Sequence, residues 1–344
     1  RVELIDLRRV GAGPTGHRLL SLPLHRAIEQ TLEARGQIIL FLNRRGFAPS
    51  LLCEACGKVV ECPSCAVALT LHRHGRARLS CHYCDHAVPL MERCPGCGSG
   101  RLSEEGAGTE RIEQALSEAF PAGRIARLDR DVAAGAKSEK VLDRMRRREI
   151  DILVGTQMVT KGHDLPDVTL VGVLNADAAL AMPDFRAAER AFHLLVQVAG
   201  RAGRGDVPGK VLIQTWQPEH PAVALAAHHD VERFVVRELE DRRELGYPPY
   251  RRMALVRVDS ADEARARDAA ERLAQIARKS AGPRVDVLGP APAPLPRLRN
   301  RYRFRFMVRS AERALMRPVL LAVARTAVDR AVRVVIDIDP VNML

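Results

Sequence analysis

All eight cysteines of the chain fall in one short stretch. They form four Cys-x2-Cys pairs, namely Cys53/Cys56, Cys62/Cys65, Cys81/Cys84 and Cys94/Cys97. Two thiolates that lie two residues apart can bind the same metal ion, and four thiolates complete a tetrahedral zinc site. Eight thiolates in this pattern therefore predict two structural zinc ions.

Two other roles for the cysteines fit the sequence less well. Disulfides are typical of secreted proteins, but no apolar leader precedes the first pair. A redox Cys-x2-Cys motif would explain one pair and not four. The nearby histidines, which we expect to be solvated loop residues or weak DNA contacts, are His72, His74, His82 and His86.

The pairing of the cysteines follows less directly from their spacing. Cys62, Cys65, Cys81 and Cys84 give Cys-x2-Cys-x15-Cys-x2-Cys, which fits the usual zinc-ribbon spacing. The remaining set of Cys53, Cys56, Cys94 and Cys97 would then form an outer site around the inner one. We prefer these nested sites, and sequential pairing across a five-residue spacer is the alternative.

Residues 50–105, the expected zinc module, contain few large apolar residues. A segment this small rarely buries enough apolar surface to fold unaided. Structural zinc contributes about 10–16 kcal/mol of apparent binding free energy, which is comparable to the stability of a whole domain. We therefore expect metal binding to fold this module.

The composition favours a multidomain protein with a polyanionic partner. A length of 344 residues predicts two or three domains. The formal net charge of +12 is explained most simply by binding to nucleic acid. The alternative is an arginine-rich composition that is typical of a high-GC genome. The sequence contains no run of 18 apolar residues that would suggest a membrane span, so we expect no membrane partner. Because the chain begins with Arg1, we expect it to be part of a longer protein.

Apolar strands alternate with amphipathic helices over the first two thirds of the chain. This alternation predicts a parallel α/β domain, made of residues 1–49 and 106–229, with the zinc module inserted in it. The strands are expected at 2–7, 37–42, 124–128, 150–154, 168–174 and 210–215, and the helices at 22–33, 109–119, 137–148 and 187–198.

From about residue 230 the order of elements changes to βαββαβ, which predicts a ferredoxin-like α+β domain over residues 230–344. The proline-rich segment 289–296 is expected to be a loop within it. The strands are expected at 253–258, 285–288, 302–308 and 332–338, and the helices at 262–279 and 311–327.

The segment Gln197-Val-Ala-Gly-Arg-Ala-Gly-Arg204 presents two arginines on a glycine-rich turn after a helix. Guanidinium groups suit phosphate because their contacts are planar, bidentate and permanently charged. A second segment, Ile152-Leu-Val-Gly-Thr-Gln-Met-Val-Thr-Lys-Gly-His-Asp164, lies upstream as a strand and loop. A lone glycine–arginine loop would more often be a solvated turn or a phosphate contact to nucleic acid.

These two segments resemble motifs VI and V of superfamily 2 helicases. The resemblance implies that Arg201 and Arg204 face the γ-phosphate of ATP, beside Gln197. It implies that Gly155, Thr156 and Gln157 line the DNA backbone, and that Gly162 and Asp164 couple this contact to the nucleotide. A turn-forming role before Leu165-Pro166 is the alternative for Asp164.

A helicase lobe interrupted by eight cysteines resembles one family, the replication restart helicases, also called primosomal protein N′. Further matching segments are Phe41-Leu-Asn-Arg-Arg-Gly46, Gly106-Ala-Gly-Thr-Glu110, Leu128-Asp-Arg-Asp131, Ala176-Asp177, Asp184-Phe-Arg186, Ala188-Glu-Arg190 and Asp337-Ile-Asp-Pro340. The resemblance implies a RecA-like C-terminal helicase lobe, nested zinc sites and an S10-like final domain. One position departs from the family pattern: this chain has Leu165 where members often carry an aromatic residue.

The same resemblance implies ATP-dependent 3′→5′ unwinding at stalled or branched forks, followed by primosome assembly. Implied partners are branched and single-stranded DNA, single-strand-binding protein and other primosome proteins, in the cytoplasm at the nucleoid. The chain has no Gly-Lys-Ser/Thr or Asp-Glu-x-His motif, so ATP and Mg²⁺ would need the preceding lobe, and this chain alone should not hydrolyse ATP. The competing class is a non-enzymatic fork-binding assembly factor.

Five arginines alternate with other residues near the end of the chain: Arg297, Arg299, Arg301, Arg303 and Arg305. Tyr302 and Phe304 lie between the last three of them, and Phe306 follows Arg305. Period-two alternation puts arginines on one face of a strand and aromatics on the other. We expect Arg301, Arg303 and Arg305 to contact DNA phosphates, the alternative being an ordinary solvated strand face.

Overall fold

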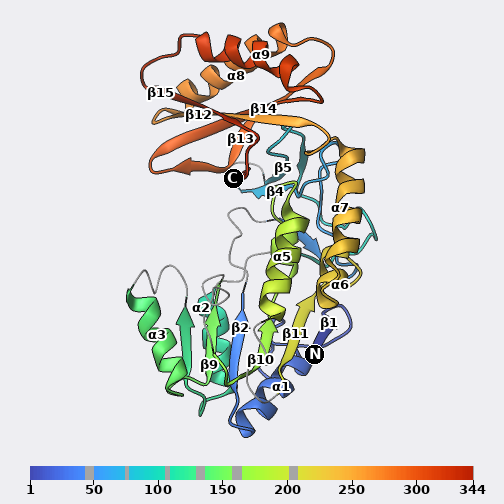
Figure 1. Ribbon diagram of the computed structural model, residues 1–344, viewed down its shortest axis with the longest axis vertical. Coiled ribbons are helices and arrows are strands. Elements are labelled where there is room, and N and C mark those ends of the chain that lie inside the picture. The colour runs from blue at the N-terminus through green and yellow to red at the C-terminus, as the bar shows by residue number, and fades with distance from the viewer. Residues whose placement is uncertain are drawn as a thin grey trace.

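The protein consists of a parallel α/β lobe, a cysteine-rich module and a C-terminal α+β unit, arranged in that order along its long axis (Figure 1). A computed structural model describes residues 1–42, 50–73, 77–104, 109–128, 136–156, 165–200 and 208–343. No helix in these ranges is long and apolar enough to cross a membrane.

The lobe is built on a six-stranded parallel sheet in the order β1-β11-β10-β2-β9-β8. The strands are β1 (Val2–Asp6), β2 (Gln37–Phe41), β8 (Ile125–Leu128), β9 (Ile152–Gly155), β10 (Val168–Val173) and β11 (Lys210–Thr215). Each coincides with a predicted strand. The RecA-like parallel sheet that the sequence predicts is therefore confirmed.

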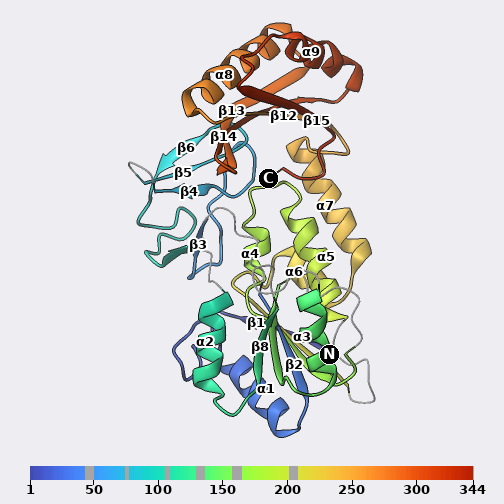
Figure 2. The same cartoon turned by 90° about the vertical axis from the view of Figure 1, so that its left-hand side faces the viewer.

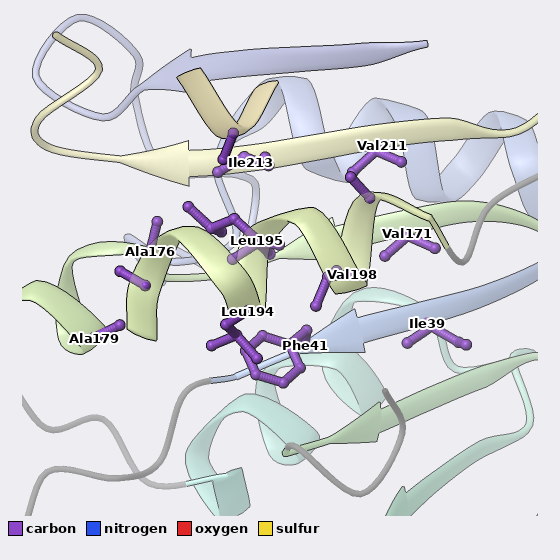
Figure 3. Close-up of a cluster of buried hydrophobic side chains, with 14 of the residues drawn as sticks. Ile39, Phe41, Val171, Ala176, Ala179, Leu194, Leu195, Val198, Val211 and Ile213 are labelled. Carbon is purple, nitrogen blue, oxygen red and sulfur yellow. The ribbon is translucent and has the colours of Figure 1, made fainter. Parts of the chain in front are cut away.

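Helices cover both faces of this sheet, which is why its central strands β2 and β9 are buried along their whole length and almost wholly apolar. They are α1 (Leu22–Glu33), α2 (Thr109–Ala119), α3 (Ala136–Arg146), α4 (Asp177–Leu180), α5 (Ala187–Ala199) and α6 (Pro221–Ala227). Helix α7 (Val231–Leu245) leads from α6 to the C-terminal unit, and its Phe234 packs in the core of the lobe (Figure 1). Figure 3 shows Leu194, Leu195 and Val198 of α5 packed over the central strands. Helices α1 and α2 pack against the opposite face.

The cysteine-rich module leaves the lobe after β2 and returns to it before α2, as predicted. It contains a two-stranded sheet of β3 (Leu51–Cys53) and β7 (Leu102–Glu104). It also contains a three-stranded antiparallel sheet of β4 (Thr70–His72), β5 (Arg78–Ser80) and β6 (Ala87–Pro89). Figure 2 shows these strands between the lobe and the C-terminal sheet.

The C-terminal unit has the predicted βαββαβ order, and its antiparallel sheet runs β13-β14-β12-β15. This is the ferredoxin-like arrangement, in which both helices lie on one face. The elements are β12 (Arg252–Ser260), α8 (Glu263–Ser280), β13 (Val285–Leu298), β14 (Arg301–Ser310), α9 (Arg313–Arg325) and β15 (Val332–Ile338).

One prediction in this unit was wrong. Residues 289–296 were expected to form a loop, but they belong to β13. β13 is an edge strand, and its pairing with β14 shifts register after Leu288 and again after Pro292. Proline is compatible with an edge strand because the missing N–H would point away from the sheet.

The second face of the C-terminal sheet is partly covered by the cysteine-rich module. Met253, Leu255 and Met307 of the sheet share one buried cluster with module residues such as Tyr83, and with Tyr247 in the turn after α7. The predicted zinc module is therefore enclosed between two larger units and packs against both of them (Figure 2).

Candidate metal centres and nucleic-acid interface

The eight cysteines form two separate groups of four. One group is Cys53, Cys56, Cys94 and Cys97, and the other is Cys62, Cys65, Cys81 and Cys84. All sulfur atoms of a group lie within 4.8 Å of one another. This is the nested arrangement that the inner zinc-ribbon spacing predicts.

The geometry of both groups fits a zinc ion. A tetrahedron with metal–sulfur bonds of about 2.3 Å has edges of about 3.8 Å. The sulfur–sulfur distances are 3.6 Å for Cys53–Cys97, 3.7 Å for Cys56–Cys94 and 3.6 Å for Cys62–Cys84. These distances are too long for disulfides, and all eight cysteines are free. The two clusters therefore suit two zinc sites, each with four thiolate ligands.

The electrostatics of the inner cluster point to a cation. A hydrogen bond from Cys65 lowers the pKa of the Cys81 thiol to about 5, whereas burial raises the pKa of Cys62 to about 12. Four crowded thiols thus favour only partial ionisation on their own. A divalent ion would hold all four as thiolates.

All four Cys-x2-Cys turns have the same backbone geometry. In each turn, the residue after the second cysteine donates its backbone N–H to the carbonyl of the first cysteine. The four pairs are Gly57–Cys53 at 2.7 Å, Ala66–Cys62 at 2.9 Å, Asp85–Cys81 at 3.1 Å and Gly98–Cys94 at 2.9 Å. The donor residue has a positive φ every time, namely 80°, 46°, 64° and 72°. The turns therefore hold each sulfur pair in a preformed position.

The outer cluster is seated on the α/β lobe. Gly57 approaches the carbonyl oxygen of Trp216 so closely that a Cβ there would lie 2.0 Å from it. Glu54 forms an ion pair with Arg18, whose guanidinium lies over the Trp216 ring. Leu52 is buried in the same apolar cluster as Trp216. The first zinc turn thus docks on the loop after β11.

The inner cluster is seated on the C-terminal unit. The Tyr247 hydroxyl donates to the carbonyl of Cys65 at 2.7 Å. His82 Nδ1 donates to the carbonyl of Pro292 at 2.7 Å, and Arg305 Nε donates to the carbonyl of His82 at 3.1 Å. Residues inside or beside the inner zinc turns therefore carry the contacts with β13 and β14.

The expectation for His82 was wrong, because its side chain is buried and not solvated. Burial lowers its pKa to about 3, so the ring is neutral and serves as a hydrogen-bond donor between two units. His72 and His86 are both half-buried, and His74 lies outside the described residues.

All three units meet at a buried tyrosine. Tyr83 lies between Cys81 and Cys84, and the backbone N–H of Phe185 in the lobe donates to its hydroxyl at 3.1 Å. The guanidinium of Arg305 lies 5.4 Å from the centre of the Tyr83 ring. Nearby, the backbone N–H of Met343 donates to Asp184 at 3.3 Å, which attaches the C-terminal segment to the lobe. No pattern in the sequence indicated this junction.

The predicted arginine strand is only partly available for DNA. Arg301 and Arg303 are partly exposed, but Arg305 is 1% exposed and also donates to the carbonyl of Met343. A contact between Arg305 and DNA is therefore wrong for this fold, because the zinc module covers that part of the strand. Burial lowers the pKa of its guanidinium to about 10.

The helicase-like segments begin at one edge of the lobe. Leu42, Leu128 and Thr156 lie at the carboxyl ends of the neighbouring strands β2, β8 and β9. Leu42 donates to Gly155 O at 2.9 Å, and Thr156 donates to Leu128 O at 3.3 Å. Ligands of open parallel sheets bind at this edge. Gln197 is exposed on the last turn of α5. The predicted residues Gln157, Gly162, Asp164, Arg201 and Arg204 lie outside the described residues.

Asp177 is a buried carboxylate that sequence reasoning gave no role. It follows β10 and accepts hydrogen bonds from the Thr215 hydroxyl at 3.1 Å and the Trp216 backbone at 2.8 Å. Burial raises its pKa to about 6. It fixes the backbone of the same loop on which Gly57 rests.

Three family models match the chain. They are the primosomal protein N C-terminal domain over residues 243–341, the helicase conserved C-terminal domain over residues 107–206, and the PriA DNA helicase Cys-rich region domain over residues 62–89. Each match falls within the part of the chain whose sequence predicts that kind of unit.

Curated relatives match along most or all of the chain. The replication restart protein PriA of Bacillus subtilis (strain 168) is 40% identical over 100% of this chain and 43% of its own length. The Treponema pallidum (strain Nichols) protein of the same name is 41% identical, covering 100% and 51%. That of Haemophilus influenzae is 36% identical, covering 94% and 45%. The chain spans about half the length of these relatives. With its helicase lobe, nested cysteine clusters and C-terminal unit, the chain belongs to the PriA family of replication restart proteins and spans a C-terminal part of such a protein.

Proposed function

We propose that the full-length protein is an ATP-dependent 3′→5′ DNA helicase that recognises stalled or branched forks and starts primosome assembly. The observation that carries this proposal is the similarity over the whole chain to replication restart proteins. This chain would supply the second helicase lobe (1–49 and 106–229), the zinc module (50–105) and the C-terminal domain (230–344).

In this proposal, ATP binds between this lobe and a preceding one. Arg201 and Arg204 stabilise charge on the transferred γ-phosphoryl group, with Gln197, Gly162 and Asp164 beside the nucleotide. Arginine fingers of this kind raise phosphoryl-transfer rates by about 10³–10⁵. Gly155, Thr156 and Gln157 contact the DNA backbone at the carboxyl edge of the sheet. That edge gathers the ends of β2, β8 and β9, which supports the assignment.

The two zinc ions would have a structural role only. Each set of four thiolates completes a tetrahedral coordination and leaves no open position for water or substrate. Their effect would be to hold the module against the lobe through the outer site and against the C-terminal unit through the inner site. Partners would be branched and single-stranded DNA, single-strand-binding protein and other primosome proteins at the nucleoid.

The test is DNA-stimulated ATP hydrolysis by the full-length protein with Arg204→Ala, beside the control Arg26→Ala on the exposed surface of α1. We expect a loss of about 10³-fold or more in kcat for Arg204→Ala only. Undiminished hydrolysis would remove the arginine-finger assignment. If the unsubstituted full-length protein binds forks but hydrolyses no ATP, a non-enzymatic assembly factor is the better account.

A further inference from the structure

The open face of the C-terminal sheet has a covered half and an uncovered half. Met253, Leu255 and Arg305 are buried where the zinc module packs against it. At the other end of the same strands, Asp259 on β12 pairs with Arg303 on β14 and with Arg333 on β15. Three neighbouring strands thus bring charged residues together beyond the edge of the zinc module.

This uncovered half contains more arginines than its carboxylates can neutralise. The Asp259 side chain is 6% exposed and is already bound by Arg333 at 2.9 Å and by Arg301. Arg257 reaches Asp337 only at 3.9 Å. Together with Arg303, four guanidinium groups face two carboxylates, so the cluster keeps a net positive charge.

Arg303 differs from the other arginines of this cluster in its lack of a partner. It is half-buried, and within the described part of the chain it has no hydrogen bond or ion pair. Burial, together with repulsion from Arg257 and Arg333, lowers the pKa of its guanidinium. A partly buried charge without a hydrogen-bonding partner is costly. An anion placed between these arginines would remove that cost.

We propose that Arg257, Arg303 and Arg333 form a phosphate-binding site for the backbone of a DNA strand. This rests on the proposed function in that it assumes the protein binds DNA, and it names the site. Guanidinium groups suit the phosphodiester because they donate paired hydrogen bonds and stay charged. The strand leaves the cluster through the cleft that begins at Arg303.

That cleft has a volume of about 790 Å³ and lies between strands β4 and β5 of the cysteine-rich module and the C-terminal unit. The rings of Tyr302 and Phe304 line it, and Arg297 lies 5.2 Å from the centre of the Tyr302 ring. Aromatic rings and arginine planes are the groups on which unpaired bases stack. Three carboxylates in the cleft stand against three further arginines, so that its charges nearly balance; they are Asp85, Glu263, Glu271, Arg78, Arg267 and Arg297. The cleft therefore suits bases, and the excess positive charge that binds phosphate lies at the arginine cluster.

The experiment measures binding of a fluorescent single-stranded oligonucleotide and a duplex to the zinc-loaded 344-residue chain over a range of salt concentrations. The variants are Arg303→Gln and the triple variant Arg257→Gln/Arg303→Gln/Arg333→Gln. The matched controls are Arg317→Gln and Arg313→Gln/Arg317→Gln, which remove exposed charges from α9 on the helix side of the unit. Zinc content and the thermal melt of each variant show that it is folded.

Each lost phosphate contact lowers the slope of log affinity against log salt by about 0.7 for a single strand and about 0.9 for a duplex. We expect a loss of about 2 in the single-strand slope for the triple variant, about 0.7 for Arg303→Gln, and no loss for the controls. A triple variant with the slope of the controls would overturn the site while DNA binding stands. A reduced slope without ATP hydrolysis in the full-length protein would instead refute only the helicase proposal. No oligonucleotide binding by the unsubstituted chain would refute the site directly.

Discussion

Replacing Gly57 with alanine tests whether the outer zinc turn is docked on the helicase lobe. Gly57 has a φ of 80°, and its Cβ would meet the Trp216 carbonyl oxygen at 2.0 Å. Gly98 occupies the same position in the other turn of the same cluster, with a φ of 72°, and a Cβ there meets nothing within 4 Å. The two substitutions therefore differ chiefly in the contact with the lobe.

The left-handed conformation costs an L-residue about 1–2 kcal/mol, and this cost applies to both variants. Gly57→Ala adds a steric clash with backbone, and overpacking of this kind typically costs about 1–3 kcal/mol more. We expect an apparent destabilisation of about 1–2 kcal/mol for Gly98→Ala and about 2–5 kcal/mol for Gly57→Ala.

Trp216 is the only tryptophan of the chain and is 4% exposed, so its fluorescence reports on this contact directly. Denaturant unfolding followed by Trp216 emission gives the destabilisation. The native emission of Gly57→Ala should also shift to longer wavelength, because water reaches the ring when the turn lifts away. Equal destabilisation of the two variants with unchanged native emission would refute the docking.

The contacts support three more predictions. Tyr247→Phe should destabilise the protein by about 1–3 kcal/mol in thermal melts, because it leaves the buried Cys65 carbonyl without its hydrogen bond. The control Tyr250→Phe loses only an exposed hydrogen bond from Arg243 and should be nearly neutral. Burial lowers the pKa of His220 from 6.5 to about 4. The neutral ring therefore contributes about 3 kcal/mol to the free energy of unfolding above pH 6.5, and this contribution is lost as the pH falls through 4. His220→Asn, which keeps a capping acceptor for α6, should flatten that part of the stability–pH curve, and an unchanged curve would contradict this reasoning. A chelator should remove two zinc ions per chain and open residues 50–104 to protease, and unchanged circular dichroism and protease resistance would argue against a metal-dependent module.

The sequence was sufficient for most of the architecture because the signals were local. Buried parallel strands such as Gln37–Phe41 are continuous apolar runs, and the Cys-x15-Cys spacing between the inner pairs predicted nested clusters. The ferredoxin-like order followed from period-two strands alternating with amphipathic helices. In each case the pattern is contained within one element or one short segment.

The contacts between units could not be read in the same way. Alternation correctly puts Arg303 and Arg305 on one face, but it does not say that the zinc module covers Arg305 and leaves Arg303 partly exposed. Likewise, Arg257 and Arg333 join Arg303 only through strand pairing over large sequence separations. The burial of His82 has the same origin, since its partner Pro292 lies 210 residues away.

The proposed activity is tested most directly by strand separation. The full-length protein is given forked DNA with either a 3′ or a 5′ single-stranded tail, and release of the labelled strand is followed with and without ATP. The account predicts ATP-dependent unwinding from the 3′ tail and none from the 5′ tail. Tight fork binding without ATP-dependent unwinding of either substrate would contradict it.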